Sequence, residues 1–245
     1  MNNQRKILIS GTSSGLGKYL YKKIGTHKYD RKTQPSYYQK IKWDLIVHCG
    51  FYAGEDITKA IESIRHSYLI SKLKSQKIIF ISSLIVYENS SNTLENTKLY
   101  IKKNSSLYNK SKILSESFFN KKNMIILRVG TLIGKYMKKN NIYKILYYKN
   151  PSLSLTKESM YSFVDHEEIL QFIEKNNNFV GILNFNRSDY INLISLSKKI
   201  KKKFNYGKFY FNCIRANNKK LNRYLDLKNT TSIKLLKKYC RYCEN

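Results

Sequence analysis

The sequence predicts an α/β fold built on an open, doubly wound parallel sheet. Short, continuous apolar runs alternate with longer segments of helical periodicity, and such runs suit strands that are covered on both faces. The expected strands are residues 7–10, 45–49, 78–82 and 125–129, with a late one at 182–185. The expected helices are residues 15–24, 57–73 and 107–120. Because strands and helices alternate, ligands are expected at the carboxyl ends of the strands.

The first strand leads into a glycine-rich turn, Gly11-Thr-Ser-Ser-Gly15-Leu-Gly17, and then into a helix. A glycine-rich motif indicates nucleotide binding when it lies between a strand and a helix, as it does here. Gly11 permits a tight turn, Gly15 lets the backbone approach a pyrophosphate, and Gly17 lets helix and strand pack closely. Free N–H groups and the helix dipole would hold the anion, although an ordinary glycine turn is the alternative. The predicted dinucleotide contacts here are Gly11, Ser13, Ser14, Gly15, Leu16 and Gly17.

Residues 27–31 are expected to form a reduced second strand, so one strand-helix unit is expected to be shortened or missing. Asp30 would accept hydrogen bonds from an adenosine ribose, which favours NAD, whereas Arg31 would pair with the 2′-phosphate of NADP. Both are otherwise loop charges, and the cofactor choice stays open. After the next strand, Gly50 is expected beside the cofactor, and His48 is expected to be a packed, hydrogen-bonded histidine.

Ser83, Tyr108 and Lys112 are predicted to form one proton-transfer unit. Ser83 follows a buried strand, and residues four apart on a helix share a face, so the Tyr108 hydroxyl and the Lys112 ammonium converge. A nearby cation lowers the pKa of a phenol from about 10. The alternative is a surface tyrosine beside a solvated lysine. On the same helix, residues 107–120, the expected packing stripe is Leu107, Leu114 and Phe118.

Taken together, these motifs resemble the extended branch of the short-chain dehydrogenase/reductase superfamily. Residues 81–87, Ile-Ser-Ser-Leu-Ile-Val-Tyr, resemble its Ser-Ser-x-x-Val-Tyr signature, and residues 108–112 resemble its Tyr-Gly-x-Ser-Lys. Residues 127–134 resemble its Leu-Arg-x-x-x-x-x-Gly segment, and residues 163–165 resemble its Val-x-Asp segment. The matches run in order over nearly the whole chain.

The resemblance implies a Rossmann-like fold and an NAD- or NADP-dependent enzyme of nucleotide-sugar metabolism. Tyr108 would move a proton to or from a sugar oxygen, and Ser83 would hold that oxygen. Lys112 would lower the pKa of Tyr108 and bind the nicotinamide ribose. Leu84 and Ile85 stand where the 4,6-dehydratases of this branch have an Asp-Glu pair, so reduction or epimerisation is expected rather than elimination.

The chain has 245 residues, enough for one structural unit. We expect a dinucleotide-binding part at residues 1–140 and a reduced substrate-binding part at residues 141–245, packed on it. Relatives of this kind often dimerise through helices equivalent to residues 57–73 and 107–120, and a homodimer is left open. A non-catalytic nucleotide sensor of the same fold is the alternative function.

The net charge of +30 invites nucleic acid as a partner. The lysines, however, are spread along the whole chain among many Asn, Ile and Tyr residues, a mixture typical of an AT-rich genome, which disfavours specific nucleic-acid binding. No apolar run is long enough to span a membrane and the first residues lack a signal region, so a cytoplasmic protein is expected. The four cysteines indicate neither a disulfide scaffold nor a metal site.

Overall fold

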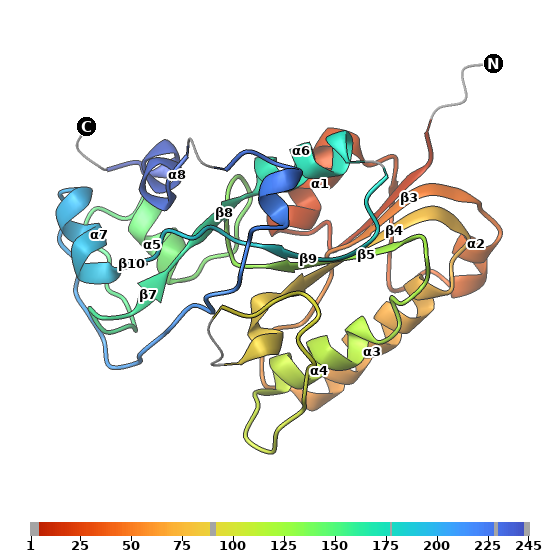
Figure 1. The fold of residues 1–245 in the computed structure, drawn as a ribbon, viewed down its shortest axis with the longest axis horizontal. Coiled ribbons are helices and arrows are strands. Elements are labelled where there is room, and N and C mark those ends of the chain that lie inside the picture. The colour runs from red at the N-terminus through yellow and green to blue at the C-terminus, as the bar shows by residue number, and fades with distance from the viewer. Residues whose placement is uncertain (1–4, 89–91, 177, 228–229, 243–245) are drawn as a thin grey trace.

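In the computed structural model, six parallel strands form a central sheet in the order β2-β1-β3-β4-β5-β9 (Figure 1). The structure describes residues 5–88, 92–176, 178–227 and 230–242. The strands of this sheet are β1 (Ile7–Ser10), β2 (His27–Lys28), β3 (Trp43–His48), β4 (Ser75–Ser83), β5 (Met124–Val129) and β9 (Gly181–Phe185). All five pairings are parallel. The predicted α/β sheet is therefore confirmed.

Helices cover both faces of the sheet. In Figure 1, α1 (Gly15–Ile24) and α6 (His166–Lys175) lie on one face, and α3 (Ile57–Ser71) and α4 (Leu107–Glu116) lie on the other. Side chains alternate between the faces along each strand. In β1, Ile7 and Ile9 join the core beneath α1 and α6, whereas Leu8 joins the core on the other face. Because both faces are buried, the strands read as continuous apolar runs.

The second strand-helix unit is short, as predicted. Strand β2 has two residues, and the helix that follows it, α2 (Pro35–Gln39), has five. Buried aromatic side chains, Tyr29, Tyr38 and Trp43, pack in the core at this unit. Trp43 Nε1 donates to the Tyr38 carbonyl at 3.1 Å, and the backbone N–H of Asp30 donates to the Tyr38 hydroxyl at 2.7 Å.

Smaller elements that follow the fifth strand surround a second core. They are β6 (Thr131–Ile133), α5 (Asn141–Tyr147), β7 (Met160–Tyr161), β8 (Phe163–Asp165), β10 (Ile191–Asn192), α7 (Leu193–Lys199) and α8 (Ser232–Tyr239). Two short 3₁₀ helices lie outside this core: η1 (Leu84–Tyr87) precedes α4, and η2 (Leu221–Arg223) places Leu221 in the core beneath α1 and α6. Strand β6 pairs with β8, and β7 pairs with β10. Between them, α6 and β9 return to the central sheet. The two parts expected at residues 1–140 and 141–245 are thus interleaved. No helix among the described residues is long and apolar enough to cross a membrane.

Helix α4 turns a different face to the protein from the one expected. Leu114 is 45% exposed, while Asn109, Ser111 and Ser115 are buried. Small side chains on the facing helix, among them Ser67, are buried as well, so α3 and α4 approach closely through small residues. The apolar stripe predicted for this helix is therefore wrong at Leu114, and Lys112 lies on the buried face.

Candidate active site

Three neighbouring strands end side by side and bring polar residues to one edge of the sheet. Ser83 at the end of β4 pairs with Val129 at the end of β5, which pairs in turn with Phe185 at the end of β9. The residues that follow these strands, Gly130 and Asn186 among them, therefore lie at the same end of the sheet as Ser83. This edge is the carboxyl end of the sheet, where the fold predicts a ligand.

A buried network fixes the segments around this edge. The Arg128 guanidinium forms an ion pair with Glu116 at 2.7 Å and donates to the Tyr87 hydroxyl at 2.6 Å. That hydroxyl donates to Asn184 Oδ1 at 2.7 Å. Tyr87 and Arg128 belong to two of the sequence motifs, at residues 81–87 and 127–134, and the network explains why these residue types occur there. It ties β5, η1 and β9 together behind Ser83.

Tyr108 reaches Ser83 from the first turn of α4. The helix begins after Ser106, whose hydroxyl accepts from the backbone N–H of Asn109 at 3.2 Å. The Ser83 side chain interacts with the Tyr108 phenol as a hydrogen-bond partner that lowers its pKa. Burial raises the pKa of Tyr108 to about 12, and the bond to Ser83 opposes that rise. The phenol is therefore protonated at neutral pH.

Lys112 is buried one turn further along α4 and faces aromatic rings. Its ammonium donates to the Ile81 carbonyl at 2.7 Å and lies 3.9 Å from the centre of the Phe51 ring and 5.8 Å from that of Tyr108. Burial lowers the pKa of Lys112 to about 7, against the pull of Glu116. We expected the lysine to lower the pKa of Tyr108, but burial raises that pKa, and the group that opposes the rise is Ser83 rather than Lys112.

The glycine turn has the geometry that its sequence predicts. Gly11 has φ +71° and approaches Gly50 so closely that a Cβ atom would lie 2.6 Å from the Gly50 Cα. Gly15 has φ +58°, and no heavy atom lies within 4 Å of the place where its Cβ would be. At Gly17 a Cβ would meet the Gly11 carbonyl at 2.4 Å. The turn and α1 therefore pack tightly beneath an open space above Gly15.

The start of α1 is suited to an anion. The N-cap residue Ser14 makes no side-chain capping bond, and the first turn has no acidic residue. The first amides of a helix have no intrahelical acceptor, and the helix dipole favours negative charge there. One of them is already engaged, because the Gly15 N–H donates to the Tyr136 carbonyl at 2.6 Å.

Of the two charged residues after β2, only Arg31 lines the cavity above the glycine turn. The Asp30 carboxylate instead accepts from the backbone N–H of Lys32 at 2.9 Å, within its own turn. The structure thus places the predicted NADP contact at the cavity and leaves the predicted NAD contact outside its wall.

His48 is a structural residue, as the sequence indicates. It is buried, with Nδ1 2.6 Å from the Ser10 hydroxyl and Nε2 3.0 Å from the Ser67 hydroxyl. Ser10 Oγ also accepts from the backbone N–H groups of Cys49 and Gly50. Its own proton is therefore directed at Nδ1, and burial lowers the pKa of His48. The neutral imidazole holds the ends of β1 and β3 together.

Two cavities meet at Ser83 and Tyr108. The first, of about 440 Å³, extends from the glycine turn past Gly50 to Lys112. The second, of about 290 Å³, continues from Tyr108 toward Asn186 and Phe211. Both are lined by Ser83, Tyr108, Val129, Gly130 and Thr131. The predicted cofactor residues other than Asp30 line the first cavity. Of the predicted catalytic residues, Ser83 and Tyr108 line both cavities, whereas Lys112 lines the first alone.

Several residues at the cavities were not predicted as site residues. Phe51 covers the Lys112 ammonium, and Asn186 and Phe211 line the second cavity. Asn186 directly follows the late strand expected at residues 182–185, so its place after a strand was the signal available. Phe211 comes from a segment without a motif, and its position depends on tertiary contacts.

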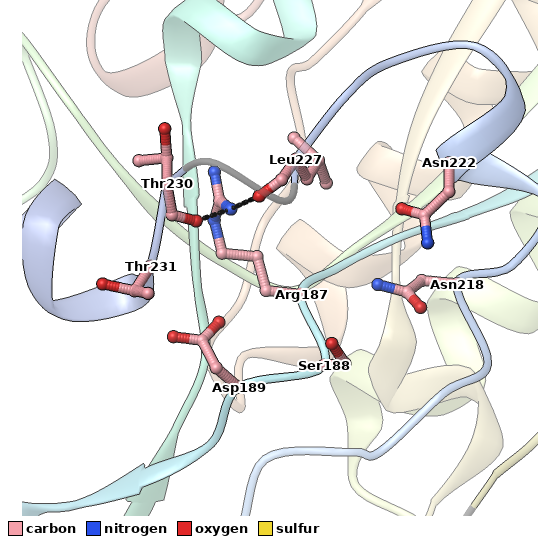
Figure 2. Close-up of a pocket in the computed structure, with 8 residues that line it drawn as sticks. All are labelled: Arg187, Ser188, Asp189, Asn218, Asn222, Leu227, Thr230 and Thr231. Atoms are coloured by element: carbon pink, nitrogen blue, oxygen red, sulfur yellow. Dashed lines mark hydrogen bonds between the residues drawn. The ribbon is translucent and has the colours of Figure 1, made fainter.

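A smaller hollow of about 120 Å³ lies beside Arg187 (Figure 2). The guanidinium does not face it as a free cation, since Nη1 donates to the Leu227 carbonyl at 2.8 Å and to the Thr230 carbonyl. Nη2 is paired with Glu168. All of these bonds go to other parts of the chain, so Arg187 has a structural role after β9. None of the predicted site residues lines this hollow.

Comparison with known proteins supports the fold. No protein-family model and no curated protein sequence matches the chain. Solved structures do: TunA, an NAD-dependent NDP-hexosamine 5,6-dehydratase involved in tunicamycin biosynthesis, matches with a TM-score of 0.77 at 11% identity, over 97% of each chain. UDP-glucuronic acid 4-epimerase from Bacillus cereus, in complex with UDP-glucuronic acid and NAD, matches with a TM-score of 0.76 at 16% identity, over 97% of this chain and 98% of that one.

A third match is dTDP-4-dehydrorhamnose reductase from Bacillus anthracis str. Ames, in complex with NADP. Its TM-score is 0.75 at 16% identity, over 98% of each chain. At such identities the likeness establishes a shared fold. The chain therefore has the Rossmann-like fold that the resemblance of its motifs implied.

Proposed function

We propose that the protein is an NAD(P)-dependent oxidoreductase or epimerase of the extended short-chain dehydrogenase/reductase type, acting on a nucleotide-linked sugar. The position of the Ser83–Tyr108 pair carries this proposal, because the pair forms part of the wall that two cavities share. A cofactor in the first cavity and a sugar in the second would meet at these two hydroxyls. The solved structures of the same fold, whose names include a dehydratase, an epimerase and a reductase, support it.

The residues present fit a nicotinamide dinucleotide. The open space above Gly15 and the uncapped start of α1 suit a pyrophosphate. Ser82 lines the same cavity, and its buried hydroxyl has no hydrogen-bond partner among the described residues. A buried hydroxyl without a partner costs about 1–3 kcal/mol, so a polar ligand there would be stabilising. Arg31 and Lys138 add positive charge to the cavity wall.

Ser83 and Tyr108 supply the proton chemistry. Ser83 would hold the oxygen of the reacting carbonyl or hydroxyl, and the protonated Tyr108 would donate to that oxygen as negative charge develops on it. In the reverse direction Tyr108 would accept the proton. Lys112, with a pKa of about 7, exchanges protons near neutral pH on the same helix. A nicotinamide dinucleotide, when bound, supplies or accepts the hydride.

Elimination chemistry has little support at this site. The positions after Ser83 hold Leu84 and Ile85, and both line the second cavity. Loss of a sugar hydroxyl needs an acid and a base beside it, and apolar side chains provide neither. Reduction and epimerisation both use the same relay and are the two reactions that we propose.

A direct assay tests the proposal. The protein is incubated with NAD or NADP, each in its oxidised and its reduced form, and a panel of nucleotide-sugars, and the absorbance of reduced nicotinamide is followed together with the stereochemistry of the products. Net oxidation of the cofactor indicates a reductase, and an inverted centre without net change indicates an epimerase. Cofactor binding with no conversion of any sugar would favour the sensor alternative. Nucleic-acid binding would be favoured as the function only if the protein bound oligonucleotides selectively and with a steep dependence on salt.

We also propose a cytoplasmic homodimer. Apolar side chains remain exposed on the two helices that cover one face of the sheet: Ile57 and Ile61 on α3 are 65% and 60% exposed, and Leu114 on α4 is 45% exposed. Burial of this face against a second copy would remove apolar surface from water. Sedimentation of the protein tests this part of the proposal independently of its activity.

A further inference from the structure

We propose that the second cavity selects an uncharged, hydroxyl-bearing sugar ring, that Asn186 accepts a hydrogen bond from one of its hydroxyls, and that a ring carrying a carboxylate is rejected. The inference rests on the proposed function, because it concerns the sugar that would face Ser83 and Tyr108. It adds a substrate class and a specificity-determining residue to that function.

The first observation is the absence of charge. Among the described residues, no acidic side chain, lysine, arginine or histidine lines this cavity. Its two titratable lining groups are Tyr108 and Cys213, and burial raises their pKa values to about 12 and about 11. Both are therefore neutral at physiological pH. A carboxylate placed here would lose water without gaining a cation.

The second observation is a mainly apolar wall. Leu84, Ile85 and Val129 come from the ends of the sheet and the turn after β4, and Phe211 and Ile214 form the opposite side. Such side chains fit the ring carbons or a methyl group of a sugar. The polar groups that interrupt them, such as Thr131 and Asn212, are uncharged. The cavity therefore matches a neutral ring with one apolar edge.

The third observation is the fixed orientation of Asn186. The side chain is buried, with Nδ2 2.9 Å from the Ala216 carbonyl and 3.2 Å from the Arg187 carbonyl and the Tyr190 hydroxyl. Two carbonyl partners identify this atom as the amide nitrogen, since carbonyls only accept. Oδ1 is left without a hydrogen-bond partner among the described residues.

Arg187 makes that orientation rigid. Its guanidinium is held by Leu227, Thr230 and Glu168, and its backbone carbonyl accepts from Asn186 Nδ2 and, at 3.2 Å, from the Ser162 hydroxyl. An acceptor that is buried, unpaired and fixed is destabilising unless a donor reaches it. None of the donors in the lining of this cavity bonds to Oδ1, so a sugar hydroxyl would be the donor that satisfies it.

The test compares neutral and acidic sugars on the same protein. With cofactor present, kcat/KM is measured for dTDP-4-dehydrorhamnose, UDP-glucose and UDP-glucuronic acid. We expect the better neutral sugar to exceed UDP-glucuronic acid by at least about a hundredfold, since an unpaired buried charge is strongly unfavourable. Ile85→Arg should narrow that ratio at least about tenfold, whereas Leu114→Arg, which adds the same charge to an exposed site, should leave it unchanged. A ratio within about threefold in the unaltered protein would overturn the inference.

Binding separates this inference from the proposed function. Calorimetric titration of the cofactor-loaded Tyr108→Phe variant gives the affinity for the same sugars without turnover. Tight binding of a neutral sugar with weak binding of the uronate would support the inference. If the unaltered protein then converted none of these sugars, that second result would contradict the proposed function and leave the inference standing. Asn186→Leu should lower the affinity for the neutral sugar about tenfold while cofactor affinity stays unchanged. Equal binding of both sugars, or of neither, would contradict the inference.

Discussion

The backbone N–H of Gly15 donates to the Tyr136 carbonyl at 2.6 Å, across the mouth of the glycine turn. Tyr136 has φ +69°, and the centre of its ring lies 5.0 Å from the Lys18 ammonium and 5.3 Å from the Lys135 ammonium. The segment after β6 therefore sits on the start of α1 and supplies an oxygen where the fold predicts a phosphate oxygen. When a pyrophosphate binds there, the Gly15 N–H would donate to a phosphate oxygen in place of the Tyr136 carbonyl.

Gly15→Ala should weaken cofactor binding. Left-handed backbone costs a residue with a Cβ atom about 1–2 kcal/mol, so the protein should lose roughly that much unfolding free energy. The strained amide and the added methyl group in the open space should also lower dinucleotide affinity about tenfold, or about 1.4 kcal/mol. Thermal unfolding and a fluorescence titration with NAD and NADP measure the two effects.

Gly181→Ala is the matched control for this change. Gly181 also has a positive φ, +99°, with open space around its missing Cβ, but it begins β9, at the opposite end of the sheet from the site. It should be destabilising to a similar extent while leaving dinucleotide affinity unaltered. An equal loss of affinity in both variants would show that the effect at Gly15 is one of stability.

Arg31→Ala should discriminate between the two cofactors. Arg31 lines the cavity and can pair with a 2′-phosphate. A hydrogen bond to a charged group usually contributes about 1.5–3 kcal/mol. We expect NADP affinity to fall at least about tenfold and NAD affinity to change less than about twofold. Lys32→Ala, at the next residue, serves as the control. Equal losses for NAD and NADP would argue against a 2′-phosphate contact.

Lys112→Met should alter how stability depends on pH. The pKa of Lys112 is about 7 in the folded protein and about 10.4 in an unfolded chain, so the unfolded state binds more protons between these values. The contribution of Lys112 therefore makes the free energy of unfolding larger as pH rises from 7 toward 10, and smaller as pH falls back to 7. The variant should be more stable than the original protein near pH 7, by an amount that shrinks toward pH 9.

Urea titrations at pH 7, 8 and 9 measure this difference. Lys110→Met is the control, because Lys110 lies on the same helix and its ammonium donates to the exposed Lys103 carbonyl at 2.9 Å. It should leave the pH dependence unchanged. A parallel pH profile for Lys112→Met and the original protein would mean that Lys112 keeps its charge at no cost in the folded state.

Local sequence was sufficient to predict the sheet and the glycine turn. Continuous apolar runs marked the strands, and the spacing of Gly11, Gly15 and Gly17 specified a turn whose geometry depends mainly on its own residues. Ser83 could be placed because it directly follows a strand, and Tyr108 because it opens the next helix. These predictions depend on backbone conformation within about ten residues.

The remaining features depend on contacts between distant segments. The contact between Gly15 and Tyr136, the place of Lys112 against Phe51, and the anchoring of Asn186 by Arg187 each join residues from different elements. The pKa values of Tyr108 and Lys112 follow from burial, which residue spacing does not report. Leu114 was misplaced because α3 and α4 meet through serines, so the small face rather than the apolar face of α4 is buried.

Replacement of the Tyr108 hydroxyl tests the central claim most directly. Tyr108→Phe removes the proposed proton donor and retains the ring beside Phe51, with Tyr100→Phe, at a residue 60% exposed, as the control. Turnover of the best nucleotide-sugar and the affinity for the cofactor are measured for each protein. We predict that Tyr108→Phe lowers turnover about 10²–10⁴-fold, as expected for loss of a general acid, while cofactor affinity stays close to that of the original protein. Undiminished turnover in this variant would contradict the proposed role of Tyr108.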